Sequence, residues 1–99
     1  MIRGTTPTLQ FTMPVDIGAL SCLYVTLAQR GMVLTEKCLE DCSYDGAVVT
    51  CKLTQKDTLA INPVHPVELQ VRAKTVEGDV LASQIATVPA YRILKDGEI

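Results

Sequence analysis

The chain has 99 residues, a formal net charge of −2 and a hydrophobic fraction of 47%. This length suits one domain and suffices to bury a core without a metal ion or disulfide bonds. The nine Lys and Arg residues are scattered, so the basic cluster typical of nucleic-acid binding is missing. No run of about 18 uncharged apolar residues predicts a membrane helix, and residues 1–7 lack the apolar core of a signal peptide. We expect one domain over residues 1–99, without nucleic-acid or membrane partners, that is made in a reducing cytoplasm.

The apolar content is high for a soluble protein of this size, with a mean hydropathy of +0.24. Small domains have much surface and little interior, so some apolar side chains are expected outside. Scattered singly they need no explanation, whereas a continuous patch marks a contact with another chain. We therefore expect a homo-oligomer or a subunit of an assembly.

Alternation of apolar and polar residues predicts β-strands through the first half of the chain. The first strand ends at Pro14, which cannot donate to a ladder. Gly31 and the Asp45-Gly46 pair mark tight turns, and Gly31 joins two strands into a hairpin. Four strands are expected here, over residues 8–13, 23–27, 32–39 and 48–53.

The second half begins with a weak capping box, Thr54-Gln55-Lys56-Asp57, which predicts one helical turn crossing between sheets. Residues 67–73 form the clearest half-buried strand, since apolar and polar side chains alternate throughout. A turn at 77–79 returns the chain as a strand over 80–88. Pro89 interrupts that ladder, so the final stretch is expected at a sheet edge.

About six or seven short strands with turns every ten residues or so predict an all-β fold. We expect an Ig-like antiparallel β-sandwich with one short helical turn. A true antibody domain is not expected, because there is no Trp and residues 67–73 lack a Cys. The apolar members of the alternating runs should form the core: Phe11, Leu23, Val25, Leu27, Val49, Leu53, Leu69 and Val71.

The four cysteines, Cys22, Cys38, Cys42 and Cys51, are interpreted as buried free thiols, because free Cys behaves as a small hydrophobe. Zinc is the alternative. Cys38 and Cys42 have a Cys-x3-Cys spacing found in structural zinc sites, and Cys22 and Cys51 would have to converge on them from separate strands. Late oxidation of the same thiols stays open.

Groups that transfer protons or attack substrates are scarce in the sequence. The one histidine, His65, lies in a proline-rich loop, and a Cys–His pair would require it beside a thiol. Most carboxylates lie in turns, where they commonly bond their own backbone. Residues 41–46 lack the alternating ligands of a calcium loop. We predict that the protein is not an enzyme and has no catalytic, cofactor-binding or metal-binding residues.

Three segments together resemble a known group of proteins: Ile2-Arg3-Gly4-Thr5-Thr6-Pro7-Thr8, Leu53-Thr54-Gln55-Lys56-Asp57-Thr58-Leu59 and Arg92-Ile93-Leu94-Lys95-Asp96-Gly97. With residues 67–72 and the turn at 77–79 between them, nearly the whole chain resembles small structural or tail-region proteins encoded by prophages of Gram-positive gut bacteria. The resemblance implies a virion or tail-region building block that is made in the bacterial cytoplasm and then carried in the virion. It implies no catalytic residue.

We therefore predict a structural or interaction module of a bacteriophage particle, which contacts other phage proteins or itself. The alternative is a soluble, phage-encoded cytosolic protein that binds a host factor. No charged residue lies between Asp79 and Arg92, which favours a covered sheet edge. The candidate interface residues are Leu81, Ile85, Val88, Tyr91, Ile93 and Leu94. A central strand over 80–88 would tolerate the same uncharged run. The terminal segments 1–6 and 91–99 are expected either to contact partners or to be frayed.

Overall fold

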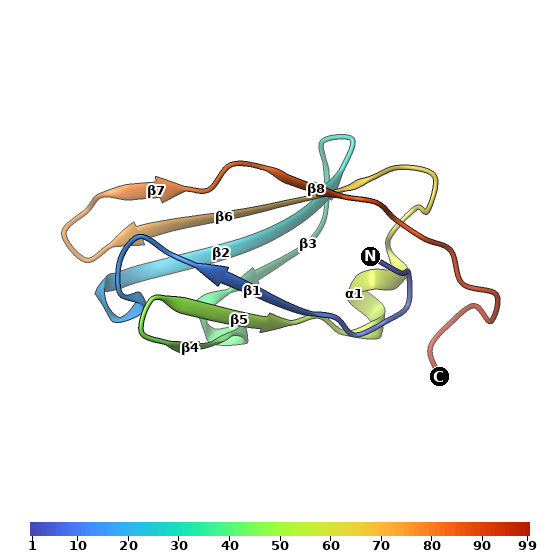
Figure 1. Ribbon diagram of the computed structural model, residues 1–99, viewed down its shortest axis with the longest axis horizontal. Coiled ribbons are helices and arrows are strands. Elements are labelled where there is room, and N and C mark those ends of the chain that lie inside the picture. Colours follow the sequence, from blue (N-terminus) through green and yellow to red (C-terminus); the bar gives the residue numbers. More distant parts are fainter.

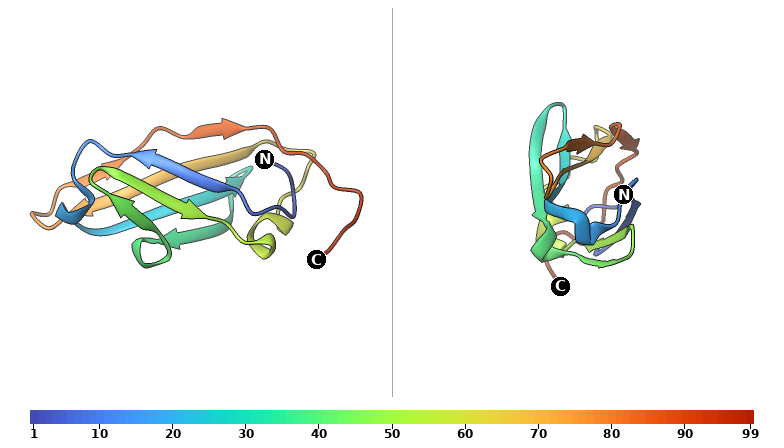
Figure 2. Two further views of the ribbon diagram at one scale, coloured as in Figure 1. Left: turned by 60° about the horizontal axis from the view of Figure 1, so that its bottom comes forward. Right: turned by 90° about the vertical axis from the view of Figure 1, so that its left-hand side faces the viewer.

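The computed structural model describes residues 1–99 and contains two antiparallel sheets with their faces packed together (Figures 1 and 2). The smaller sheet has the strand order β1-β5-β4, with β1 Thr8–Thr12, β4 Ser43–Asp45 and β5 Val48–Lys52. The larger sheet has the order β3-β2-β6-β7, with β2 Leu20–Gln29, β3 Met32–Cys38, β6 Val67–Thr75 and β7 Val80–Ala82. Strand β8, Ala86–Val88, also pairs with β6. The expected all-β sandwich is confirmed.

Short helical turns connect the strands: η1 Ile17–Ala19, η2 Leu39–Asp41 and α1 Gln55–Leu59. The capping box predicted before α1 is formed in both directions. The Asp57 N–H donates to Thr54 Oγ1 over 3.1 Å, and the Thr54 N–H donates to Asp57 Oδ2 over 2.8 Å. Helix α1 therefore begins where expected, on the crossing from β5 in one sheet to β6 in the other.

The core lies along the inner faces of β2 and β6, the two long central strands. In their register Val25 lies opposite Val71 and Leu27 opposite Leu69, so each inward row packs beside the other. Seven of the eight expected core residues are buried: Leu23, Val25, Leu27, Val49, Leu53, Leu69 and Val71. Phe11 is only partly buried, because β1 is an edge strand and leaves one flank of the ring uncovered.

The hairpin from β2 to β3 turns at Arg30 and Gly31, whose φ angles are both positive, +51° and +78°. Two consecutive positive φ values define the tight turn whose twist matches that of antiparallel strands. Just before it, Gln29 is buried rather than part of an exposed turn. Its side-chain NH₂ donates to the carbonyls of Asn62 (2.7 Å) and His65 (2.8 Å), and its oxygen accepts from Asn62 N–H (2.8 Å). This amide holds the proline-rich loop against the sandwich.

Several expected strand boundaries are wrong. Strand β2 begins at Leu20 rather than at residue 23, and β4 is an additional strand of three residues. The single strand expected over 80–88 is divided into β7 and β8, which brings the total to eight strands. Both pieces pair only with β6, so the interpretation of 80–88 as a central strand is also wrong. After Pro89 no strand forms, and only an isolated parallel bridge joins Tyr91 to Ile2.

Candidate interaction edge

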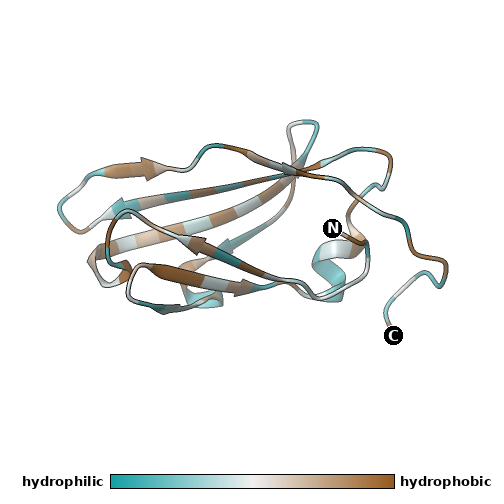
Figure 3. Ribbon diagram, viewed as in Figure 1, coloured by the Kyte–Doolittle hydropathy of each residue, from teal (hydrophilic) through white to brown (hydrophobic).

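Strands β7 and β8 form one open edge of the larger sheet, visible along the top of Figure 1. Figure 3 shows that β7 is strongly hydrophobic, whereas the facing part of β6 alternates. An open edge presents main-chain N–H and C=O groups to any chain that can pair with it. Both strands of this edge lie within the uncharged run between residues 79 and 92.

The break between β7 and β8 is held by Ser83. Its N–H donates to the Val71 carbonyl over 2.8 Å, and its hydroxyl oxygen accepts from the Val71 N–H over 3.0 Å. Gln70 Nε2 adds a bond to the Ser83 carbonyl over 3.0 Å. Beyond Ser83 the pairing register changes, because Leu69 lies opposite Ala86. The edge segment around Ser83 therefore has one more residue than the stretch of β6 that it faces. This is a bulge that directs Ile85 outward.

The structure separates the six predicted interface residues into two groups. Ile85, Tyr91 and Leu94 are well exposed, at 55%, 54% and 91%. Leu81, Val88 and Ile93 are only partly exposed.

Two of the partly exposed residues, Leu81 and Val88, are covered by neighbours. Leu81 lies opposite the buried Ala73 and so faces inward, and Val88 packs against the core. One exposed side chain was absent from the predicted set: Val80, which is 57% exposed and points to the outer face beside Lys74.

The two terminal segments pair with each other, so neither is a free arm or a frayed end. The Tyr91 N–H donates to the Met1 carbonyl over 3.0 Å, and the Arg3 N–H donates to the Tyr91 carbonyl over 3.0 Å. Arg3 also forms an ion pair with Asp96. Farther along, the Gln55 side chain bonds both main-chain groups of Ile99, at 2.9 and 3.0 Å. These bonded main-chain groups are not available to a partner, and contacts of residues 1–6 and 91–99 with a partner through their other groups stay a prediction.

Gly4 is required at this junction. Its φ is +77°, and a Cβ added there would lie 2.9 Å from Ile93 Cδ1 and 3.2 Å from Leu59 Cδ2. Gly4→Ala should displace Ile93 and loosen the segment after Tyr91, with a cost of about 1–2 kcal/mol from backbone strain. We expect faster tryptic cleavage after Arg92.

Gly97→Ala is the matched control for this variant, because Gly97 has a similar φ of +83° but open space around the added Cβ. Equal cleavage rates for the two variants would contradict a packing role for Gly4.

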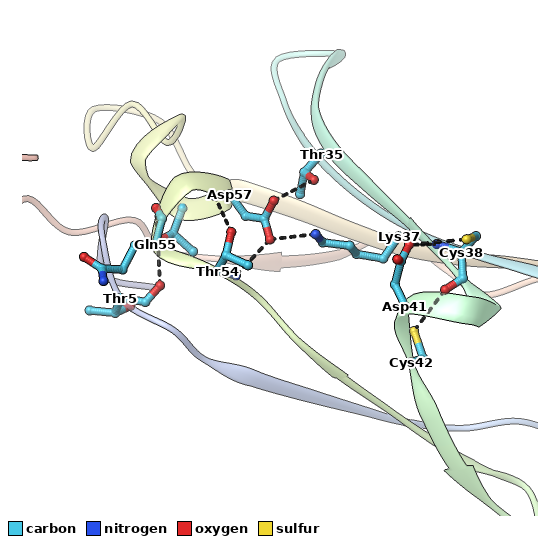
Figure 4. Close-up of polar contacts among 10 residues, drawn as sticks. Thr5, Thr35, Lys37, Cys38, Asp41, Cys42, Thr54, Gln55 and Asp57 are labelled. Carbon is cyan, nitrogen blue, oxygen red and sulfur yellow. Dashed lines mark hydrogen bonds and ion pairs between the residues drawn. The ribbon is translucent and has the colours of Figure 1, made fainter. Parts of the chain in front are cut away.

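A polar cluster on the opposite side of the sandwich joins β3 to α1 (Figure 4). Lys37 Nζ lies 2.9 Å from Asp57 Oδ2, and the two side chains are only 19% and 13% exposed. The other carboxylate oxygen of Asp57 accepts from Thr35 Oγ1 over 3.2 Å. Burial raises the pKa of Asp57, but bonds from Thr54 and Lys37 outweigh it and hold the pKa below its usual value. The bonds from Thr35 and Lys37 to Asp57 connect β3 to α1.

The four thiols are free, and they occupy different environments. Only Cys51 is buried, so the expectation of four buried thiols is wrong for Cys22, Cys38 and Cys42, which are partly exposed. Cys22 lies on the outer face of the larger sheet, whereas Cys51 faces the core. These two therefore do not converge as a four-cysteine zinc site would require. No group of three His, Cys, Asp or Glu side chains has an arrangement that could hold a metal ion.

His65 lies in the loop that Gln29 anchors, and a hollow of about 340 Å³ lies beside it. The hollow is lined by Gln29, Arg30, Met32, Leu34, Ala60 and Asn62 in addition to His65. It contains neither a thiol nor a carboxylate, so the fold does not assemble a Cys–His pair there.

Comparison of the chain with protein-family models, with curated proteins and with solved structures finds no match. None of the helices has the length and hydropathy needed to cross a membrane.

Proposed function

We propose that the protein is a non-enzymatic structural or interaction module of a bacteriophage particle. It is made in the cytoplasm of the bacterial host, and it contacts other particle proteins or copies of itself. The observation that carries the interaction role is the open, uncharged β7–β8 edge. The resemblance of residues 2–8, 53–59 and 92–97 to prophage-encoded structural proteins supports the phage assignment.

The edge has main-chain groups ready for pairing. Main-chain bonds to β6 flank β7 on both sides: Ser83 N–H donates to Val71 O, and Thr75 N–H donates to Asp79 O, each over 2.8 Å. These bonds fix which residues of β7 direct their main-chain groups toward β6 and which direct them away. By that alternation Val80 and Ala82 direct their N–H and C=O groups away from β6. An extended segment of a partner can add there as a further strand, with main-chain bonds for affinity and apolar pockets for specificity.

The opposite edge of the same sheet, β3, is less suited to such a contact. Met32 and Val33 are exposed at 72% and 61%, but Arg30 precedes them and Glu36 and Lys37 follow on the strand. Charged side chains on an edge strand oppose the approach of another strand. The β7–β8 edge has no such charge, so we assign the contact to it.

The same edge would serve the alternative function, in which a soluble phage-encoded protein binds a host factor. Mass spectrometry of purified particles distinguishes the two. Stoichiometric recovery of the chain in particles supports the structural role. Its absence from particles, together with a stable complex in the host lysate, would favour the alternative.

Replacing Val80 and Ile85 together by Lys should weaken the contact while the domain remains folded. Both side chains are more than half exposed, so the folded monomer tolerates the charges, whereas an interface would bury them unpaired. Sedimentation velocity should show association weakened by about tenfold or more, the effect of losing roughly 1.4 kcal/mol.

Met32→Lys with Val33→Lys on β3 is the control for the edge variant, since it adds the same two charges at similarly exposed positions. It should leave association unchanged. Equal weakening by this β3 variant, or a wild-type chain that stays monomeric and is absent from particles, would overturn the proposed function.

A further inference from the structure

The register of the smaller sheet brings two cysteines together. Ser43 pairs with Thr50 and Tyr44 with Val49, so one step farther along the two strands Cys42 lies opposite Cys51. On its other side Cys51 pairs with Leu9 of β1. Leu9, Cys51 and Cys42 thus form one row across the sheet, and all three pack into the same core cluster.

The main-chain hydrogen bonds of β5 show which type of antiparallel pair Cys42 and Cys51 form. Main-chain bonds from Leu53 N–H to Pro7 O (2.9 Å) and from Met13 N–H to Ala47 O (2.8 Å) show that odd-numbered residues of β5 bond toward β1. By alternation, Cys51 makes no main-chain bond toward β4, and the Cys42 N–H donates instead to the Leu39 carbonyl over 3.1 Å.

The Cys42–Cys51 pair is therefore a non-hydrogen-bonded antiparallel pair. In such pairs the Cα atoms lie about 4.5 Å apart and the side chains approach closely. That separation falls within the range of about 4.4–6.8 Å in which a disulfide closes without backbone movement.

The other two thiols are directed elsewhere. Cys38 Sγ donates to Asp41 Oδ2 over 3.3 Å (Figure 4). Cys22 lies on the outer face of the larger sheet, beside Tyr24. The Cys42 thiol donates to the Cys38 carbonyl over 3.4 Å, and it packs into the same core cluster as Cys51. Among the four cysteines, Cys42 and Cys51 are the two that the strand register places opposite each other.

We propose that Cys42 and Cys51 are a site of reversible oxidation, at which a small-molecule disulfide converts the two thiols into one cross-strand disulfide bond. The Cys42 thiolate attacks the small disulfide, forms a mixed disulfide and releases one reduced thiol. The Cys51 thiolate then attacks the Cys42 sulfur, which closes the protein bond and releases the second reduced thiol. Two protein thiols lose two electrons and two protons, and one small disulfide becomes two thiols.

Cys42 reacts first because it is partly exposed, whereas Cys51 is fully buried. Burial and the neighbouring Cys51 thiol raise the pKa of Cys42 to about 12, and burial also raises the pKa of Cys51. Only the thiolate attacks, so the site closes slowly at neutral pH and faster as the pH rises. The reduced state is therefore protected kinetically in a reducing compartment.

The bond would strengthen a weak part of the sandwich. Strand β4 has only three residues and pairs on one side alone. A link from Cys42 to the central strand β5 would hold the η2–β4 corner in place and restrict the unfolded chain. The oxidised protein should unfold at a higher temperature than the reduced one.

The test compares two double variants incubated folded with oxidised glutathione at pH 8, followed by denaturation, alkylation of remaining thiols and mass spectrometry. Cys22→Ser with Cys38→Ser keeps the proposed pair. It should lose two hydrogens, carry no glutathione, accept no alkylating agent and show a melting temperature raised by several degrees. Dithiothreitol should reverse each change. Cys42→Ala with Cys51→Ala should form no intramolecular bond.

Several results would overturn the proposal. One is a first variant that keeps two alkylatable thiols or retains glutathione, although circular dichroism shows it folded. Peptide mapping of the oxidised wild-type chain gives a second readout that does not depend on variant folding. A Cys42–Cys51 peptide supports the proposal, and a Cys38–Cys42 or Cys22–Cys38 peptide in its place contradicts it.

Discussion

Replacing Leu27 by Ala is expected to lower the free energy of unfolding by about 2–5 kcal/mol, the range for a buried Leu whose cavity cannot collapse. Leu27 is fully buried and lies on β2 between Thr35 of β3 and Leu69 of β6. Strands on both sides fix its surroundings, so relaxation around the cavity is limited. The whole free energy of unfolding of a domain of this size is roughly 5–15 kcal/mol. The loss should therefore be visible in a urea titration.

Leu94→Ala removes the same atoms from a side chain that is 91% exposed, which makes it the matched control. A change within about 0.5 kcal/mol is expected there. If both variants lost equal stability, Leu27 would not be a core residue and the assigned packing of the two sheets would be wrong. The comparison tests the sandwich independently of any function.

The parts of the fold that sequence predicts well are those with local causes. Apolar and polar residues alternate strictly along β6, because one face of the strand is buried and the other faces solvent. The apolar members Val67, Leu69, Val71 and Ala73 are all buried. The Thr54–Asp57 capping box depends on residues three apart and is likewise recognisable. Hairpin turns follow from Gly and Asp at fixed positions.

Features that depend on distant partners could not be predicted. The break in the edge strand arises because the Ser83 hydroxyl bonds Val71 in another strand, and nothing near Ser83 in sequence indicates this. Lys37 occupies an inward position of an alternating run, which is unfavourable until Asp57 is placed beside it by α1. The pairing of Arg3 with Asp96 joins opposite ends of the chain.

The sequence can indicate a sheet edge near residues 80–91, because the absence of charge from Val80 to Tyr91 is a local property, and β7 and β8 do pair with β6 alone. The role of this edge in binding a partner stays a prediction. Which side chains point outward was not predictable, because the bulge after Ser83 shifts the alternation by one residue. The candidate set rested on the uncharged composition of this stretch, which does not distinguish the two faces of a strand, so it included the inward-facing Leu81 and left out Val80. Ile85 is exposed as the prediction requires, whereas the exposure of Val80 could be determined only from the folded chain.

Asp57→Ala is the second substitution for which we expect a large effect, a loss of about 2–3 kcal/mol. It removes the reciprocal cap of α1, worth about 1 kcal/mol. It also leaves the Lys37 ammonium, which is only 19% exposed, without its partner, and an unpaired charge in such a place is costly. Asp79→Ala in the exposed turn between β6 and β7 is the control and should change stability by less than about 0.5 kcal/mol.

The sign of the pH dependence gives this prediction a second, independent readout. Because the pKa of Asp57 in the folded protein lies below its usual value, its charged form is bound more strongly in the folded state. That stabilisation is complete above the unfolded-state pKa of about 3.9 and is lost as the pH falls through the folded-state pKa. The stability difference between wild type and Asp57→Ala should therefore be largest near neutral pH. It should shrink between about pH 5 and pH 2 in urea titrations followed at each pH. A difference that stays constant across that range would mean that the Asp57 charge contributes nothing, through either the cap or the ion pair, and that the variant acts only through packing.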